Sequence, residues 1–263
     1  QPMIYYPISV LMVAGITEIL IITTPDHKKI FENLLGDGSN IGLNLSYTIQ
    51  DKPRGLADAF ILGEEFIGND SICLMLGDNL LYGDGLTKIL KESINQVEDN
   101  ENAVVFGYYV NKPEDYGIIQ LNQNGEIVSI EEKPSHPTSN YAIIGLYFYP
   151  NNVIQLAKKV KPSLRGEIEI TSINQAYLNN NKIKANLLGR GFTWMDTGTH
   201  ESLLEASQLI KSLEKRTGLK IGCLEEIAFN KGLISQKDLK KSLQNIQDSP
   251  YKNYILKLVT RNE

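Results

Sequence analysis

Short apolar runs alternate with amphipathic segments through the first half of the chain. Runs rich in β-branched and aromatic residues predict buried strands, and apolar residues spaced three or four apart predict helices. The predicted strands span 18–24, 45–50, 71–76 and 103–110, and the helices between them span 28–35, 56–67 and 86–97. This alternation predicts an α/β fold, a doubly wound and mostly parallel sheet flanked by helices on both faces.

The second half of the chain has a more mixed pattern. Residues 118–121 and 126–130 flank an Asn-Gln-Asn-Gly segment, which predicts a hairpin because Asn-Gly suits the positive φ angles of a tight turn. Further predicted strands span 141–149, 183–188 and 192–195, and predicted helices span about 151–160 and 168–179. From about residue 200 the pattern is helical. We therefore expect an α/β core over residues 1–200 and a helical C-terminal appendage over 201–263.

Composition and charge exclude several classes of protein. Hydrophobic residues make up 42% of the 263 and charged residues 22%, a globular mixture that argues against disorder and fibres. Lys and Arg number 26 against 31 Asp and Glu, a net charge of −5 that argues against coating nucleic acid. Two cysteines make no disulfide framework. No apolar stretch approaches the roughly 20 residues that cross a bilayer, so we expect a cytoplasmic protein.

Two aspartates follow predicted strands, where ligands bind in open α/β sheets. The run SICLML leads to Gly77, Asp78 and Asn79, and the run GFTWM leads to Asp196. A carboxylate on a strand end suits Mg²⁺ held against phosphate oxygens. The alternative is that each aspartate only caps the turn or helix that follows it. Spacing leaves both interpretations open and does not place the two aspartates together.

A lysine and a glutamine add two further candidates. Lys133 follows Glu132 at a predicted strand end and precedes Pro134, which stops the regular structure. A lysine there can neutralise a phosphate, and the carboxylate of Glu132 can accept hydrogen bonds from sugar hydroxyls. A solvated charged loop is the ordinary alternative. Gln50 has the amide donors and the acceptor that can read a nucleobase edge, and Gly55 opens a helix whose amides could face a ligand. For these two residues the alternative is a plain connection between strand and helix.

Several common motifs are absent from the sequence. It contains no G-x-G-x-x-G, no G-x-x-x-x-G-K-[ST] and no G-x-S-x-G segment. Dinucleotide-binding, P-loop and serine-hydrolase chemistry are therefore disfavoured. The histidines, His27, His136 and His200, lack metal-ligand spacing.

Nine ordered segments together resemble the glucose-1-phosphate thymidylyltransferases, the dTTP-using branch of the sugar nucleotidyltransferases. They extend over essentially the whole chain and read PMIYYPISVLM, LLGDG, LSYTIQ with GLADAF, LGDN, VNKPEDYGII, IEEKP, NYAIIGLYFY, RGEIEIT and WMDTGTH. The resemblance implies a Rossmann-like nucleotide-diphospho-sugar transferase fold with a helical C-terminal part. It also implies a sugar-binding subregion over about 111–190 and a homotetramer.

The resemblance further implies the reaction and the roles of particular residues. The reaction joins dTTP and α-D-glucose 1-phosphate into dTDP-glucose and pyrophosphate, the first step towards dTDP-L-rhamnose and related deoxysugars. Its cofactor is Mg²⁺, with Asp78 and Asp196 as metal ligands and Asp78 also counted among the nucleotide-binding residues. The positions matching thymine contacts are Gln50 and Gly55. Lys133 matches the lysine on the sugar phosphate, and the matching sugar contacts are Tyr116, Gly117, Glu132 and Ile143.

The family signature G-G-x-G-T-R-L-x-P is absent from this chain. The first residues already read as the middle of an apolar helix. From the family pattern we expect that on the order of 30 residues, including a central strand, normally precede them. Two alternatives to the thymidylyltransferase interpretation stay open. One is a non-catalytic sugar-nucleotide-binding paralogue or inactive fragment, and the other is a UTP-using relative.

Overall fold

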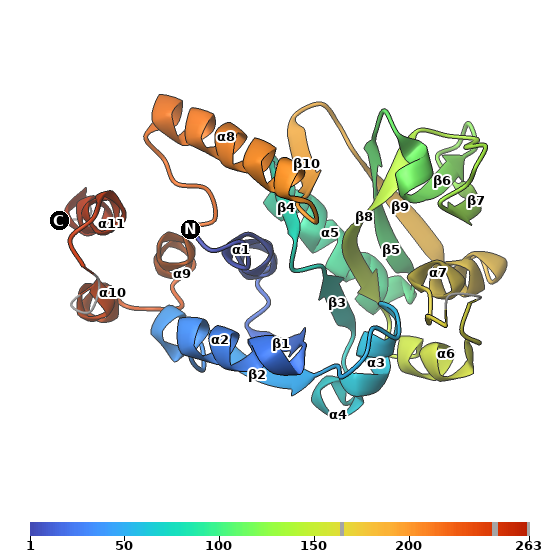
Figure 1. Cartoon of the computed structure of the whole chain (residues 1–263), viewed down its shortest axis with the longest axis horizontal. Coiled ribbons are helices and arrows are strands. Elements are labelled where there is room, and N and C mark those ends of the chain that lie inside the picture. Colours follow the sequence, from blue (N-terminus) through green and yellow to red (C-terminus); the bar gives the residue numbers. More distant parts are fainter. Residues whose placement is uncertain (164–165, 244–246, 262–263) are drawn as a thin grey trace. The chain divides into compact units, whose positions relative to one another are not determined.

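Helices and strands alternate along the chain largely as the pattern predicts (Figure 1). The computed structural model describes residues 1–163, 166–243 and 247–261. It divides into two compact units, which we call unit one (Gln1–Ile49 with Leu203–Glu263) and unit two (Gln50–Ser202). The predicted division into an α/β core over residues 1–200 and a helical appendage over 201–263 stays a prediction.

Unit one combines a short sheet with helices from both ends of the chain. Strands β1 and β2 pair in parallel, from Glu18 opposite Asn44 to Thr23 opposite Ile49. Lys231 Nζ donates to the carbonyl oxygen of Val13 at 2.7 Å, which ties the C-terminal helices to the first one. Its elements are α1 (Tyr5–Ala14), β1 (Glu18–Thr23), α2 (Pro25–Leu35), η1 (Ser39–Ile41), β2 (Asn44–Ile49), α8 (His200–Thr217, which begins in unit two), α9 (Leu224–Asn230), α10 (Gln236–Ser242) and α11 (Pro250–Arg261).

Unit two contains the larger sheet. Its elements are α3 (Asp58–Leu62), α4 (Glu64–Ile67), β3 (Ile72–Met75), β4 (Asn79–Gly83), α5 (Leu86–Asn100), β5 (Ala103–Tyr109), η2 (Pro113–Asp115), β6 (Gly117–Leu121), β7 (Ile127–Glu132), β8 (Tyr141–Tyr149), α6 (Val153–Lys159), α7 (Ile170–Asn179), β9 (Ile183–Leu188) and β10 (Phe192–Asp196). The helix predicted over 56–67 is two short helices, because the chain breaks at Gly63.

The prediction of a mostly parallel sheet is wrong. Among the described residues, two strand pairs are parallel and five are antiparallel. The prediction treated each strand as followed by a crossover helix, but β3 turns directly into β4 and the β6–β7 hairpin continues into β8. The hairpin makes β6 and β7 antiparallel neighbours, while β3 and β4 pair antiparallel with the distant strands β8 and β10 and not with each other. The observed fold is a mixed α/β structure with a curled sheet.

Strand β8 organises this sheet. One edge pairs with β5, and the other edge pairs first with β6 and then with β3. All of β8 from Ala142 onward is buried. Apolar side chains from α3, α6 and α7 pack against it in one cluster that includes Phe60, Ile154 and Ile173. Because β8 reaches both β3 and β6, it joins two parts of the chain on which the predicted site residues lie.

Within the described ranges, no helix combines the length and the apolar composition needed to cross a membrane.

Candidate active site

The turn after β3 places Asp78 beside a buried asparagine. Asn79 is 3% exposed, and its Oδ1 accepts hydrogen bonds from the Gly145 amide at 3.0 Å and from Trp194 Nε1 at 2.7 Å. Its Nδ2 donates to Asp78 Oδ1 at 2.9 Å. A buried amide must satisfy its polar atoms, so Asn79 ties Asp78 to β8 and β10. A Cβ on Gly145 would lie 2.6 Å from Asn79 Oδ1, so only glycine fits there.

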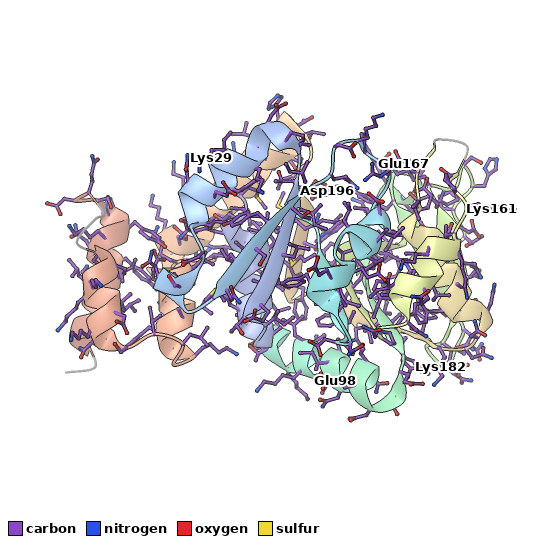
Figure 2. The ribbon with its side chains drawn as sticks, turned by 90° about the horizontal axis from the view of Figure 1, so that it is seen from below. Lys29, Glu98, Lys161, Glu167, Lys182 and Asp196 are labelled. Carbon is purple, nitrogen blue, oxygen red and sulfur yellow. The ribbon has the colours of Figure 1, made fainter. Side chains whose placement is uncertain are left out.

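Strand β10 brings Asp196 to the same place. It pairs antiparallel with β4, and Asp196 lies opposite Asn79. The Asp78 carbonyl oxygen accepts from the Thr197 amide at 2.9 Å and from Thr197 Oγ1 at 2.7 Å. A Cβ built on Gly198 would lie 3.1 Å from Asp196 Oδ1 and 3.7 Å from Asp78 Oδ2. Both carboxylates therefore flank one point, an arrangement that the sequence left open (Figure 2 labels Asp196).

The electrostatics of Asp196 show a carboxylate short of positive partners. Burial raises its pKa, and the negative charge of Asp78 raises it further, while the Gly198 amide and Lys133 act in the opposite direction. The positive charge of Lys133 thus acts on Asp196 and favours its ionised form. Two carboxylates thus flank one point, and a hard cation there would relieve the repulsion between them.

Lys133 leaves β7 in an unusual backbone conformation. Its φ is +42°, which non-glycine residues rarely adopt and which often marks a functional position. Its amide donates to the Tyr116 carbonyl oxygen at 3.0 Å. Gly117 pairs with Glu132 across β6 and β7, and Thr171 Oγ1 donates to the Glu132 carboxylate. The predicted sugar-contact residues Tyr116, Gly117 and Glu132 therefore adjoin Lys133.

Aromatic contacts connect the sugar-contact residues with the aspartates. The Tyr116 ring meets Trp194 edge-on at 5.3 Å between centroids, and Trp194 bonds to Asn79 as described above. Burial, followed by the charge of Asp196, raises the pKa of Tyr116. Ile143, by contrast, is buried in the apolar core of unit two. Its predicted place in a sugar pocket stays a prediction.

The residues described so far, around Asp78, Asp196 and Lys133, form a first cluster. Gln50 and Gly55 form a second cluster. Gln50 Nε2 donates to Asp58 Oδ2 at 2.8 Å. Gly55 has φ +97°, and a Cβ there would lie 2.5 Å from the Ile168 carbonyl oxygen. The helix predicted to open at Gly55 begins at Asp58 instead. Ile168 also donates to the Arg54 carbonyl oxygen at 2.6 Å. Because Thr171 lies three residues after Ile168, one short segment contacts both clusters.

Reasoning from the sequence missed Asp58, Thr171 and Trp194. Each acts through a hydrogen bond to a residue outside its own local pattern, so no signal in the sequence could have found it. The sequence does place Asn79 at the strand end beside Asp78, but gives no sign that its side chain holds that aspartate.

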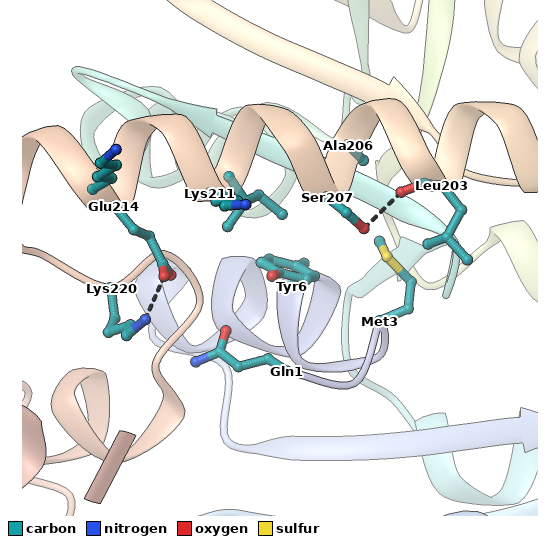
Figure 3. Close-up of a pocket in the computed structure, with 11 residues that line it drawn as sticks. Gln1, Met3, Tyr6, Leu203, Ala206, Ser207, Lys211, Glu214 and Lys220 are labelled. Carbon is teal, nitrogen blue, oxygen red and sulfur yellow. Dashed lines mark hydrogen bonds and ion pairs between the residues drawn. The ribbon is translucent and has the colours of Figure 1, made fainter. Parts of the chain in front are cut away.

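A cavity of about 400 Å³ lies in unit one (Figure 3). Tyr6 of α1 and Lys211 of α8 line it, together with Glu214, which pairs with Lys220. None of the predicted site residues lines this cavity. It therefore belongs to neither of the two clusters of site residues.

Comparisons with known proteins identify the family of this chain. The sequence profile of the family described as Nucleotidyl transferase matches residues 1–212. A glucose-1-phosphate thymidylyltransferase of Neisseria meningitidis is 48% identical over 99% of this chain and 90% of its own length. One from Mycobacterium tuberculosis is 46% identical over 100% of this chain and 90% of its own length.

Solved structures show the same similarity. One is a protein of Bacillus anthracis described as a glucose-1-phosphate thymidylyltransferase, in complex with a sucrose. It matches with a TM-score of 0.72 and 40% identity, covering 79% of this chain and 82% of that one. A UDP-glucose pyrophosphorylase complexed with UDP-glucose matches with a TM-score of 0.69 and 26% identity, covering 81% and 87%. This chain belongs to the nucleotidyl transferase family and, within it, to the glucose-1-phosphate thymidylyltransferases.

Proposed function

We propose that this protein transfers a thymidylyl group from dTTP to α-D-glucose 1-phosphate, forming dTDP-glucose and pyrophosphate. Two relatives that are 46–48% identical to this chain, over about 90% of their own length, are named glucose-1-phosphate thymidylyltransferase. The observation that carries the proposal is that Asp78 and Asp196 flank one point, because a cation held there would place positive charge between two phosphate-bearing substrates.

The aspartate pair fits a Mg²⁺ ion, which the family resemblance implies. Two carboxylates face one point, and burial together with the negative charge of Asp78 raises the pKa of Asp196. Mg²⁺ is typically held by one or two carboxylates, with substrate phosphates and waters completing its shell. Asp78 and Asp196 would hold the ion, and when bound it neutralises charge on the phosphate oxygens.

The remaining residues bind and orient the two substrates. A phosphate oxygen of glucose 1-phosphate attacks the α-phosphorus of dTTP in line, and the bond to pyrophosphate breaks. Lys133 neutralises the sugar phosphate, which otherwise repels the triphosphate, and Glu132 accepts sugar hydroxyls beside Tyr116 and Gly117. The attacking oxygen is already ionised at neutral pH, so the reaction needs no general base.

Gln50 and Gly55 serve the nucleobase in this proposal. Their cluster includes an amide with both donors and an acceptor, and Gly55 keeps the backbone close to Ile168. Ile143 would complete the sugar pocket. By the same resemblance the protein is a cytoplasmic homotetramer, which light scattering on the purified protein would test.

A UTP-using enzyme is the second candidate, favoured by the structural match to UDP-glucose pyrophosphorylase. The bases of dTTP and UTP differ by one methyl group, which a pocket discriminates by about 1–3 kcal/mol at most, and their sugars differ by the 2′-hydroxyl group. We therefore expect dTTP to be preferred over UTP by a modest factor. A preference for UTP in kcat/KM would favour the second candidate.

The test measures pyrophosphate release with dTTP, glucose 1-phosphate and Mg²⁺, using protein expressed from its complete reading frame. Mass spectrometry of the sugar nucleotide identifies the product. Formation of dTDP-glucose that stops when the metal is chelated supports the proposal. If the protein binds dTDP-glucose but makes no product with any nucleoside triphosphate, it is instead a non-catalytic paralogue.

A further inference from the structure

Asp58 is a buried acid to which the proposed chemistry assigns no role. It opens α3 and is 4% exposed. Its Oδ2 accepts from Gln50 Nε2 at 2.8 Å and from Arg54 Nε at 3.1 Å. Arg54 also forms an ion pair with Asp51, in which Nη1 donates to Oδ1 at 2.6 Å. A buried carboxylate is costly unless it is paired and hydrogen-bonded, so the Gln50 amide helps to satisfy it.

This contact determines which way the Gln50 amide faces. The oxygen and nitrogen ends of a glutamine amide have nearly the same shape, and a half-turn of the last torsion exchanges them. An ionised carboxylate only accepts hydrogen bonds. Turning the Gln50 oxygen towards Asp58 would therefore set two acceptors against each other. With Nε2 on Asp58, the atoms left for a ligand are Oε1 and the second Nε2 hydrogen.

We propose that Asp58 is a positioning residue for nucleobase selection, holding Gln50 so that its carbonyl oxygen meets the base. The inference rests on the proposed function, in which Gln50 contacts the nucleobase. An oxygen at that point selects a pyrimidine with an N–H donor at ring position 3, as in thymine and uracil. Cytosine has an acceptor at position 3, and two facing acceptors disfavour its binding.

The contact of the Gln50 carbonyl oxygen discriminates between bases at ring nitrogen 3 and does not involve the thymine methyl group. It should therefore set the preference for dTTP over dCTP without affecting the preference for dTTP over UTP. This difference separates a positioning role from general damage to the fold, which would lower the use of all three nucleotides together.

The experiment compares kcat/KM for dTTP, UTP and dCTP in the wild-type enzyme and in Asp58→Asn. Asparagine can donate or accept, so the Gln50 amide becomes free to turn. We expect the dTTP to dCTP ratio to fall about tenfold or more, and the dTTP to UTP ratio to change less than about twofold. An unchanged dTTP to dCTP ratio in a folded variant would overturn the proposal.

A double-mutant cycle shows whether Asp58 acts through Gln50. In a Gln50→Ala background, Asp58→Asn should produce no further change in the dTTP to dCTP ratio. A further fall of similar size would mean that Asp58 acts by another route. Asp51→Asn is the matched control, because it removes the other carboxylate that contacts Arg54 and keeps the contacts of Asp58 with Arg54 and Gln50. It should retain the wild-type ratio.

A second variant covers the case in which Asp58→Asn fails to fold. Arg54→Met with Asp58→Leu removes both charges together and leaves no unpaired buried charge. It also frees the Gln50 amide, so the same fall in the ratio is expected. Wild-type protein that makes no product from dTTP would refute the proposed function. Active wild-type protein with unchanged ratios in the folded variants would refute only the role of Asp58.

Discussion

The two units use buried polar groups in different ways. Among the described residues, the buried polar side chains of unit two include Asp58, Asn79 and Thr197, and each holds a proposed site residue. Unit one has Ser9, whose Oγ donates to the Tyr6 carbonyl oxygen within its own helix at 2.6 Å. Burying a polar group requires a partner. The partners of these three side chains of unit two are parts of the proposed site, whereas Ser9 bonds to local backbone, as Ser93 of unit two also does.

The sheets of the two units explain this difference. Unit one has two parallel strands, and its helix α2 has no fully buried residue, with Ile30 58% exposed. In unit two, the β4–β10 pair and strand β8 bring together segments that lie far apart in the sequence. All the predicted site residues belong to unit two. Chemistry that needs several side chains at one point is placed where distant strands meet.

Removing either metal-facing carboxylate is the strongest test of this contrast. Asp78→Asn and Asp196→Asn should each lower kcat/KM by about a thousandfold or more, because the charge that would hold Mg²⁺ is lost. Steady-state kinetics over a range of Mg²⁺ concentrations measures the effect. Asp26→Asn, in α2 of unit one, is the control and should keep wild-type kinetics. Near-normal turnover in Asp78→Asn would refute the metal assignment.

Replacing Lys133 should separate the two substrates. Lys133→Ala should raise KM for glucose 1-phosphate about 10–100-fold, since a charge-assisted contact to phosphate is lost. KM for dTTP should change much less. The control is Lys231→Ala in unit one, which loses only the bond to the Val13 carbonyl. Equal effects on both substrates would contradict the assigned role of Lys133.

The core of unit two offers a test of stability without a change in the site. Tyr149 is fully buried, and its Oη donates to Asn174 Oδ1 at 2.5 Å. Within the described residues, Asn174 Nδ2 has no partner. Tyr149→Phe would leave the Asn174 oxygen unsatisfied as well, at a cost of about 1–3 kcal/mol in the free energy of unfolding. Urea denaturation measures it, with Tyr109→Phe on the exposed side of β5 as control.

A change in unit one should affect stability alone. Ser235 caps α10 through a reciprocal pair of bonds with Asp238. Ser235→Ala should lower the free energy of unfolding by about 1 kcal/mol, because the first helical amides lose their acceptor. Thermal unfolding checks the loss, and kcat should stay at the wild-type value. A large fall in kcat would show that unit one takes part in the chemistry and would break the contrast.

The smallest expected effect concerns the stability of metal-free protein. Burial raises the pKa of Asp196 above its ordinary value of 3.8, so the folded state holds this proton more tightly than the unfolded state. Stability from this group is therefore lost as pH rises through the raised pKa. Asp196→Asn lacks that loss and should melt at a higher temperature than wild type at pH 7 in EDTA. The difference should vanish below about pH 4, and its persistence there would assign the gain to another cause.

Local elements followed closely from the sequence. The strands over 141–149 and 183–188 match their predictions, and the Asn-Gly turn joins the predicted hairpin. These elements depend on side-chain periodicity and turn chemistry within a few residues. The sheet direction did not follow, because it depends on which strands pair.

The sequence by itself determined the family and the candidates Asp78, Asp196 and Lys133, since strand ends and ordered segments are local patterns. Only the tertiary structure decided that the two aspartates flank one point. That arrangement depends on the antiparallel pairing of β4 with β10, which places Asp196 opposite Asn79. The structure also assigned Asn79 and Asp58 to hold Asp78 and Gln50. Burial makes those hydrogen bonds obligatory, and burial is a property of the packed chain.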